Sequence, residues 1–247
     1  MNMEFTYLDH KHIEAIQAQR MEAISFLAAG ISNDIKNLLL VILSCASVIK
    51  RMNPNRDIQN RIEVIISCCE KMDEMLKKLM LIGKSINHLR IDLINLNEEI
   101  KNTLKLLESK IPSCIEIKTS LGDIPLIYAD STAIGEIITN LITNAIQAMP
   151  DGGFIEIKTA FTTVTKEDCK DHANAYPGRF VVLSIIDNGP GIPKEMLPRI
   201  FDFGFSTKNS HGLGLAMVYG LVEMHKGWIH VESEMERGTR FIIFLPV

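Results

Sequence analysis

The sequence lacks several patterns that would place it in other classes of protein. Its longest hydrophobic stretch, residues 38–49, contains serine and cysteine and is shorter than the roughly 20 residues that cross a bilayer. No signal peptide precedes it, and any sensor or membrane segment of a parent protein is expected outside this chain. The formal net charge is -4 and the lysines are scattered, which excludes an electrostatic nucleic-acid surface. No GxxxxGKS/T loop is present, which excludes a Walker-type nucleotide site.

Cysteine is scarce, and its spacing fits no known framework. The five cysteines are an odd number without a CxxC pair: Cys45, Cys68, Cys69, Cys114 and Cys169. This argues against both a disulfide framework and a zinc site, and we expect a reducing cytoplasm. With 247 residues and 47% hydrophobic residues, the chain can form one large or two small domains with real cores.

The first third of the sequence predicts a helical hairpin. Hydrophobic residues recur at helical spacing over residues 12–50 and again over 58–84, and Asn53-Pro54-Asn55 interrupts the pattern. Two helices cannot bury such wide apolar faces by themselves, so we expect a symmetric dimer that forms a four-helix bundle. The alternative is that the hairpin packs on the rest of its own chain. We assign this domain to residues 1–86.

The remainder, residues 87–247, alternates strands and helices. Strands are predicted at residues 92–96, 114–119, 126–128, 154–163, 180–187, 229–233 and 239–245. Helices are predicted at residues 97–110, 132–149 and 213–226, with a short turn at 194–199. The pattern predicts an α+β fold in which helices back one mixed sheet, as an α/β sandwich.

Two asparagines mark one face of the helix predicted at residues 132–149. A spacing of four residues places Glu136, Asn140 and Asn144 on the same side. A single asparagine there would favour a buried amide that caps a neighbouring loop. Two at this spacing favour a site for a metal and phosphates, with an Asn144 oxygen on Mg²⁺, a cation that prefers oxygen ligands.

Two glycine-rich loops follow. Asp187-Asn188-Gly189-Pro190-Gly191 ends a predicted strand, and a sequence of this kind is by itself often only a turn. The second loop, residues 210–215, reads Ser-His-Gly-Leu-Gly-Leu and opens a helix. Free amides and the helix dipole at such a position favour phosphate oxygens.

In their order and spacing these three motifs resemble the ATP-binding domain shared by histidine kinases, Hsp90, gyrase and MutL, the GHKL or Bergerat-type fold. The resemblance implies that Asp187 accepts a hydrogen bond from the exocyclic amine of adenine, while Gly189 and Gly191 let the backbone approach the ring. It also implies a phosphate-covering lid over residues 205–211. The other implied nucleotide contacts are Lys208, His211, Gly212, Leu213, Gly214 and Thr239. Ser210 departs from the family, which commonly has a glycine there.

The first predicted helix resembles the phosphoacceptor helix of a two-component histidine kinase, but the acceptor histidine is replaced by Asn33. A carboxamide is a poor nucleophile, whereas an imidazole nitrogen can attack a γ-phosphate. The resemblance implies that Asp34 orients and deprotonates the acceptor and that Asn37 positions water for dephosphorylating a response regulator. Both side chains could instead be ordinary polar residues on an exposed helix face.

The resemblance as a whole implies a homodimeric kinase core that binds ATP and Mg²⁺ and passes a phosphoryl group to a response regulator. Hydrolytic members of the superfamily carry a glutamate where this chain has Asn140, so transfer to a protein is expected rather than rapid hydrolysis. Autophosphorylation should fail at Asn33, whether that residue arose by engineering or naturally. The alternative function is a pseudokinase, phosphatase or docking module that acts on a response regulator.

Overall fold

The computed structural model describes residues 35, 38–52, 55–85, 89–171, 174–202, 205 and 213–247. Its residues fall into two compact units that meet along the chain between His88 and Leu89. Each unit is described by itself below. Within the described residues, no helix is both long enough and apolar enough to cross a membrane.

The first unit contains a helical hairpin. One helix covers residues 38–51, and the second, α2 (Arg56–Ser85), begins where the Asn55 side chain accepts a hydrogen bond from the Ile58 amide at 3.0 Å. Leu39 and Cys69 pack together between the helices, and Lys50 Nζ lies 3.4 Å from Glu63 Oε1. The two helices therefore run antiparallel. The predicted helix at 58–84 is confirmed, and residues 12–34 of the first predicted helix lie outside the described residues.

Much of the apolar surface of the hairpin is exposed among the residues that the structure describes. Its buried hydrophobic residues among those described are Leu39, Ala46, Ile62 and Cys69. A second stripe on each helix is exposed: Leu38, Ile42, Ile49 and Met52 on the first helix, at spacings of four, seven and three residues, and Ile58, Ile65 and Met72 on α2, at spacings of seven. Two apolar stripes on one helix are typical of a helix that packs against two neighbours.

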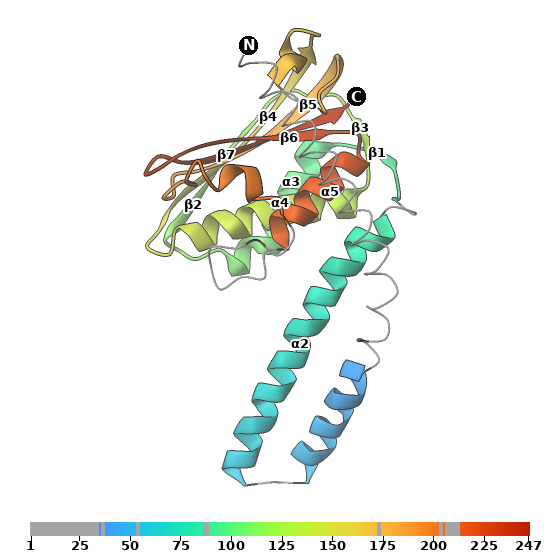
Figure 1. The fold of residues 1–247 in the computed structure, drawn as a ribbon, viewed down its shortest axis with the longest axis vertical. Helices are drawn as coiled ribbons and strands as arrows, with labels where there is room; N and C mark the ends of the chain where they lie inside the picture. Colours follow the sequence, from blue (N-terminus) through green and yellow to red (C-terminus); the bar gives the residue numbers. More distant parts are fainter. Residues whose placement is uncertain are drawn as a thin grey trace. The chain divides into compact units, whose positions relative to one another are not determined.

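The second unit is an α/β sandwich built on a five-stranded sheet, as expected from the sequence (Figure 1). The strand order is β2-β4-β5-β7-β6, in which β2 and β4 are parallel and the other pairs antiparallel. A separate antiparallel pair joins β1 (Asp92–Ile94) and β3 (Ile127–Ala129). The bounds of the main strands are β2 (Ile115–Leu121), β4 (Gly153–Val164), β5 (Gly178–Asp187), β6 (Trp228–Glu234) and β7 (Gly238–Pro246).

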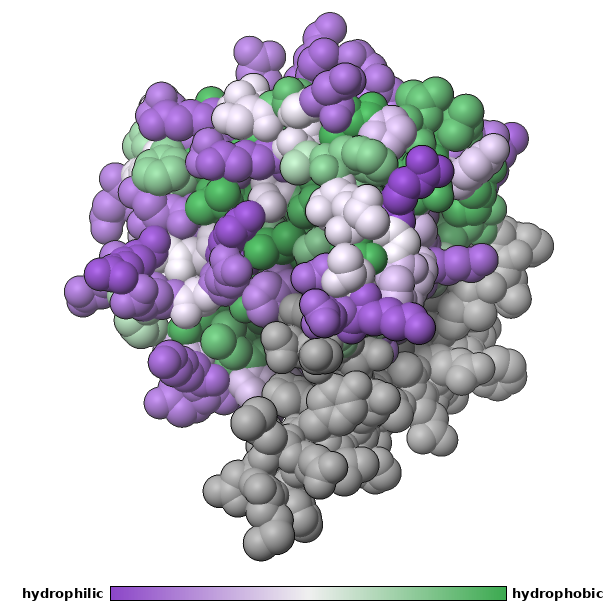
Figure 2. Space-filling view, turned by 90° about the horizontal axis from the view of Figure 1, so that it is seen from above, coloured by the Kyte–Doolittle hydropathy of each residue, from purple (hydrophilic) through white to green (hydrophobic). Residues whose placement is uncertain are grey.

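Three helices cover one face of this sheet: α3 (Leu96–Leu107), α4 (Ser131–Ala148) and α5 (Gly214–Met224) (Figure 1). The core lies between the layers, where Ile138 and Ile142 of α4 and Ile157 of β4 are fully buried. Buried residues alternate along the first half of β4, at Ile155, Ile157 and Thr159, as expected for a strand with one face on helices, whereas β5 is buried at most of its positions. On the face shown in Figure 2, hydrophobic residues lie between hydrophilic side chains.

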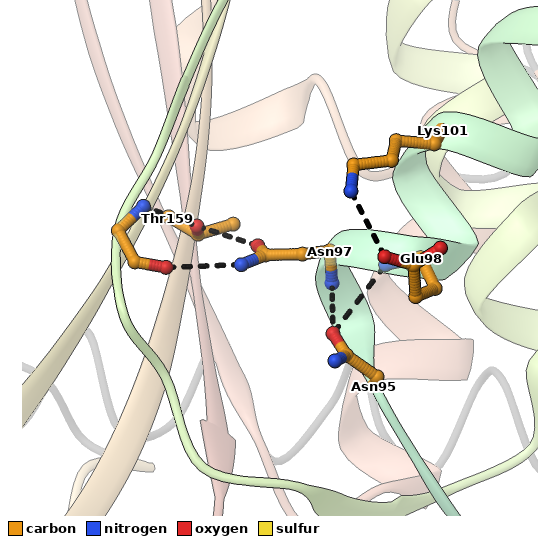
Figure 3. A network of polar contacts seen from close by, with 6 residues as sticks. Asn95, Asn97, Glu98, Lys101 and Thr159 are labelled. Carbon is orange, nitrogen blue, oxygen red and sulfur yellow. Dashed lines mark hydrogen bonds and ion pairs between the residues drawn. The ribbon is translucent and has the colours of Figure 1, made fainter.

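A polar network attaches the start of α3 to the sheet (Figure 3). Asn95 Oδ1 accepts from the amides of Asn97 and Glu98, which caps the helix. Asn97 donates to the Gly122 carbonyl at 2.9 Å and accepts from the Thr159 hydroxyl at 2.8 Å. Thr159 is 5% exposed, so this network satisfies a buried hydroxyl. These asparagines therefore have a structural role.

Two element boundaries differ from the sequence predictions for local physical reasons. The first strand was expected to reach residue 96, but it ends at Ile94 because Asn95 is the N-cap of α3. The helix expected at 97–110 ends at Leu107 and continues as a 3-10 turn, Glu108–Lys110. A further 3-10 turn, Asp168–Asp171, lies in the connection between β4 and β5, where no element was predicted.

Candidate functional site

Asp187 is the last residue of β5 and is 7% exposed. Its Oδ1 accepts two backbone hydrogen bonds, from the Gly189 amide at 2.9 Å and from the Thr239 amide at 3.3 Å. The β5–β7 register produces the second bond, because it pairs Asp187 directly with Thr239. A carboxylate held by two amides has a fixed orientation, which suits it to recognise one particular donor.

The residues around Asp187 leave no room for side chains. Gly238 has a φ of +101°, and a Cβ there would collide with the Asp187 carbonyl oxygen. Gly191 has a φ of +76°, and a Cβ there would collide with the Glu234 carbonyl oxygen. A Cβ on Gly189 would lie 2.9 Å from Asp187 Oδ1. The glycine predicted at 189 is therefore explained by the Asp187 and Met149 side chains beside it, and the glycine at 191 by the Glu234 backbone and a left-handed conformation.

The loop after β5 is tied to the turn between β6 and β7. The Ile192 amide donates to Ser233 Oγ at 2.8 Å, and the Glu236 amide donates to the Pro190 carbonyl at 2.8 Å. Thr239, predicted as a nucleotide contact, has its hydroxyl 2.9 Å from Ser233 Oγ and uses its amide to hold Asp187. The described contacts thus give Thr239 a supporting position behind Asp187.

Asn140 and Asn144 lie together at the N-terminus of α5. A Cβ built on Gly214 would be 3.1 Å from Asn140 Oδ1 and 3.8 Å from Asn144 Nδ2. Asn140 is 7% exposed and donates through Nδ2 to the Glu136 carbonyl at 2.7 Å. Among the described contacts, Glu136 interacts with Asn140 through its backbone carbonyl oxygen. The predicted common face of α4 is confirmed for the two asparagines, and it faces the first turn of α5.

The Asn144 side chain has a buried polar atom that is unpaired among the described residues. Its Nδ2 finds no hydrogen-bond partner within the described part of the chain. A buried amide group without a partner costs about 1–3 kcal/mol, so such a group commonly marks a place where a ligand completes the bonding. Rotation of the carboxamide about its last bond exchanges nitrogen and oxygen, so the same position can present an oxygen to a cation. The residue therefore fits a Mg²⁺ ligand.

The start of α5 supplies backbone donors beside these asparagines. Leu213 is the N-cap, and no side chain caps the helix among the described contacts. The Met217 amide is bonded to the Leu213 carbonyl at 3.0 Å, so the amides of Leu213 and the first turn have no place in the helix ladder. Helix α5 has 11 residues, and its N-terminus carries the positive end of the helix dipole. An anion placed there would accept hydrogen bonds from the free amides and be attracted by the helix dipole.

Helix α4 connects the two groups of residues. Its C-terminal end contacts the glycine loop, because a Cβ on Gly189 would lie 3.1 Å from Met149 Cγ and 3.5 Å from Ala148 Cβ. Asn140 and Ala148 are eight positions apart on this helix, which corresponds to about 12 Å at 1.5 Å per residue. The carboxylate and the asparagine pair therefore lie along one helix at a separation that an extended nucleotide can span.

Several predicted site residues cannot be placed. Lys208, His211 and Gly212 lie outside the described residues, as do Asn33, Asp34 and Asn37 on the first predicted helix. Two supporting residues were not singled out from the sequence. Asn188 accepts from the Phe154 amide at 2.8 Å, and its position inside the glycine motif was an available signal. Ser233 bonds both the Ile192 amide and Thr239, and nothing in the sequence marks it.

Comparison with known proteins identifies a matching family and several relatives of this chain. Residues 129–247 match the model of the family described as histidine kinase-, DNA gyrase B-, and HSP90-like ATPase. The chain is similar to the sensor kinase CckA of Brucella abortus (strain 2308), with 32% identity over 93% of this chain and 25% of that protein. It is also similar to the sensor histidine kinase ZraS of Escherichia coli O157:H7, with 30% identity over 95% of this chain and 48% of that protein. The chain thus spans less than half the length of these relatives.

Solved structures of histidine kinases share the fold of this chain. The catalytic domain of the histidine kinase ThkA is 30% identical, with a TM-score of 0.52, over 64% of this chain and 95% of that domain. The fold is shared with full-length ShkA in complex with AMPPNP, with 18% identity and a TM-score of 0.72, over 90% of this chain and 46% of that one. It is also shared with ThkA in complex with the response regulator protein TrrA, with 24% identity and a TM-score of 0.60, over 100% of this chain and 68% of that one. This chain belongs to the histidine kinase family.

Proposed function

We propose that this chain is the core of a two-component histidine kinase that binds ATP with Mg²⁺ between α4, α5 and the loop after β5. The observation that carries the proposal is the combination of a buried carboxylate held by two amides with two asparagines at the N-terminus of α5. A carboxylate of fixed orientation suits the exocyclic amine of adenine, and free amides suit phosphate oxygens.

At the adenine end, Asp187 accepts the hydrogen bond and the glycine loop provides space for the ring. Gly189 and Gly191 keep the backbone close to the carboxylate. The loop is held against the β6–β7 turn by two bonds, in which the Ile192 amide donates to Ser233 and the Glu236 amide donates to Pro190. Thr239 supports Asp187 from behind through its amide. These contacts fix the orientation of the Asp187 carboxylate and of the loop beside it.

At the phosphate end, Asn144 would provide an oxygen ligand for Mg²⁺, and Leu213 and Gly214 would provide backbone donors. Magnesium commonly keeps several waters and takes one or two protein ligands plus substrate phosphates, so a single neutral oxygen is sufficient. When bound, it supplies neutralisation of phosphate charge. Lys208, His211 and Gly212 are proposed as further phosphate contacts, by resemblance to the family.

The reaction we propose is transfer to a protein rather than hydrolysis. The position where hydrolytic relatives carry a glutamate is Asn140, whose amide nitrogen is committed to the Glu136 carbonyl. With no carboxylate at that position to activate water, an attacking group of the protein receives the γ-phosphoryl group. In the family this group is a histidine with an adjacent acid, here Asn33 and Asp34. Asn33 cannot act as the acceptor, so autophosphorylation is blocked in this chain.

The proposed partners are a second copy of this chain and the receiver domain of a response regulator. The exposed stripes of the hairpin support the dimer, since Leu38, Ile42 and Ile65 are exposed in the part of the chain that the structure describes. ThkA, whose fold this chain shares, was solved in complex with the response regulator protein TrrA, and this supports the second partner. Asn37 would position water when the regulator is dephosphorylated. We place the protein in the cytoplasm, where response regulators are located.

A second candidate function is favoured by Asn33 itself. A chain that binds ATP but has no acceptor can act as a pseudokinase, a phosphatase or a docking module for a response regulator. Asp34 and Asn37 retain the polar groups for that work, and neither role requires an imidazole at position 33.

Nucleotide binding is the test of the proposed site. We expect Mg-AMPPNP to bind the chain in isothermal calorimetry, and Asp187→Asn to weaken binding at least about tenfold, because its amide would direct a donor at the donor of adenine. Asp123→Asn, the same change at an exposed loop position, is the matched control and should bind normally. Equal affinity of the Asp187 variant, with its fold retained, would refute the adenine assignment.

A further inference from the structure

His225 is a buried histidine that the proposed nucleotide chemistry does not use. It is 5% exposed and follows the last residue of α5. Its Nδ1 lies 2.7 Å from the Leu221 carbonyl oxygen, and its Nε2 accepts from the Asp130 amide at 3.0 Å. A carbonyl can only accept, so the proton is on Nδ1 and Nε2 is the bare acceptor. Both ring nitrogens are therefore satisfied, in one tautomer.

Asp130, the residue that His225 contacts, forms hydrogen bonds through its amide, through both carboxylate oxygens and, with the Ile134 amide at 2.9 Å, through its carbonyl. Its amide donates to His225, and its Oδ1 accepts from the Ala133 amide at 3.0 Å, which caps α4. Its Oδ2 accepts from the Arg90 amide at 2.8 Å. Arg90 lies in the segment between α2 and β1, by which the chain enters the second unit. One residue thus joins the end of α5, the start of α4 and the entry segment.

The end of α5 at His225 is firmly closed. The Lys226 amide donates to the Glu223 carbonyl at 2.8 Å, and the Gly227 amide donates to the Val222 carbonyl at 3.0 Å. Lys226 has a φ of +57°, so these bonds form the Schellman arrangement that terminates a helix. A helix of 11 residues is about 16 Å long at 1.5 Å per residue. Helix α5 thus connects Gly214, its first residue, to His225, which follows its last.

We propose that His225 is a positioning residue that fixes α5 to α4 through Asp130, and that the same contact couples the phosphate end of α5 to the backbone of the entry segment at Arg90. The proposal rests on the proposed nucleotide site, because Gly214, at the other end of α5, lies beside Asn140 of α4. Ordering of α5 by a nucleotide restricts His225, which stabilises the Asp130 amide and, through the Asp130 carboxylate, the bond to Arg90. By reciprocity, loosening the entry segment weakens nucleotide binding.

If His225 only fills the core, a different result is expected. Its replacement would lower stability without separating nucleotide affinity from the exchange of one distant amide. The two halves of the His225 contact can also be separated by substitution. His225→Gln keeps an acceptor within reach of the Asp130 amide, and His225→Leu keeps the bulk but leaves that amide without a partner. Asp130→Asn keeps one oxygen to cap α4 and loses the second acceptor, the one bonded to Arg90.

The experiment measures two quantities on the full chain and on each variant. The first is the affinity for Mg-AMPPNP at a temperature where circular dichroism shows the variant folded. The second is backbone hydrogen exchange over residues 89–95, with and without saturating Mg-AMPPNP. In the unmodified chain we expect nucleotide to slow exchange in this segment. His225→Leu should weaken affinity at least about fivefold and abolish the slowing, while His225→Gln restores both.

Asp130→Asn isolates the link to Arg90. We expect this variant to exchange faster over residues 89–95 without nucleotide and to respond less when nucleotide is added. Because it keeps the His225 contact and the α4 cap, it also decides the case if His225→Leu fails to fold. Unchanged exchange in Asp130→Asn, or normal affinity in a folded His225→Leu, would overturn the proposal.

Failure of the proposed function has a different signature. If the unmodified chain does not bind Mg-AMPPNP, the nucleotide assignment is wrong, and the His225 link is judged from exchange without nucleotide. Faster exchange over residues 89–95 in His225→Leu than in His225→Gln then supports the link, and equal exchange overturns it.

Discussion

The helical hairpin and the C-terminal α/β domain differ in where their hydrophobic side chains lie. In the domain, Ile138, Ile142 and Ile157 are almost completely removed from solvent between helices and sheet. In the hairpin, Ile42 is 45% exposed and Ile65 is 44% exposed, although both occupy regular helical spacing. Burial of a large aliphatic side chain contributes roughly 1.5–3 kcal/mol. The domain therefore obtains this stabilisation from its own helices and sheet, whereas the described part of the hairpin leaves such side chains exposed.

The largest expected effect comes from making the same substitution in both regions. Ile157→Ala should lower the free energy of unfolding of the C-terminal domain by about 2–5 kcal/mol, because it creates a cavity in a closed core. Ile65→Ala should leave that transition unchanged and destabilise the hairpin, the more so as the protein is diluted. Urea unfolding followed by fluorescence of Trp228, the single tryptophan, reports on the domain, and far-UV circular dichroism adds the hairpin. Concentration-independent unfolding of the hairpin would contradict the contrast.

A smaller effect is expected at the end of α5. Lys226 adopts a left-handed backbone that favours glycine, and its carbonyl accepts from the Tyr176 hydroxyl at 2.8 Å. Lys226→Gly keeps this backbone bond and removes the strain of the side chain, so it should stabilise the domain by about 0.5–1 kcal/mol. Lys194→Gly is the control, since Lys194 is not among the residues with positive φ, and it should give no gain. The midpoint of the Trp228 transition measures both, and a loss in Lys226→Gly would show that the conformation costs nothing.

The smallest expected effect concerns pH and Glu223. Burial raises the pKa of this carboxyl above its ordinary value of 4.5, and the Tyr219 hydroxyl, which donates to Oε1 at 3.0 Å, opposes the shift. A raised pKa in the folded state stabilises the fold below about pH 4.5, and this contribution is lost as the pH rises through the folded value. Glu223→Gln keeps the acceptor and does not titrate.

The variant should therefore match the unmodified chain near pH 4 and be slightly more stable near pH 7, by a few tenths of a kcal/mol, since the group is partly solvated. Urea unfolding at the two pH values measures the difference. Glu195→Gln, at an exposed position, should show no such change with pH. A Glu223 variant that is less stable near pH 7 would reverse the sign of the proposed burial effect.

In both regions, the features that could be predicted from the sequence are those that depend on residues close together along the chain. Helical periodicity located α2 to within two residues, and the spacing of Asn140 and Asn144 predicted a shared face that does meet Gly214. Both features are local, because they depend on residues within a few turns of one helix. The end of β1 was misplaced although its signal was local as well: Asn95 followed by Glu98 is a helix start.

Long-range partners could not be predicted in the same way. His225 bonds a residue 95 positions away, and Asn97 bonds Thr159 across 62 positions. These pairs are created by the sheet register and by the packing of α4 against α5, which no single stretch of sequence specifies. Thr239 shows the limit most clearly, since its predicted role was direct contact with the nucleotide and its described contacts support Asp187.

The most direct test of the account is an intact-mass phosphorylation assay with Mg-ATP that compares this chain with its Asn33→His variant. We expect only the histidine variant to gain a phosphoryl group, and that group to be lost in acid, because the proposed function places the block at the acceptor atom of residue 33. No labelling of either folded protein would contradict the kinase assignment and favour a docking or phosphatase role. Labelling of the unmodified chain would contradict the central claim that Asn33 blocks autophosphorylation.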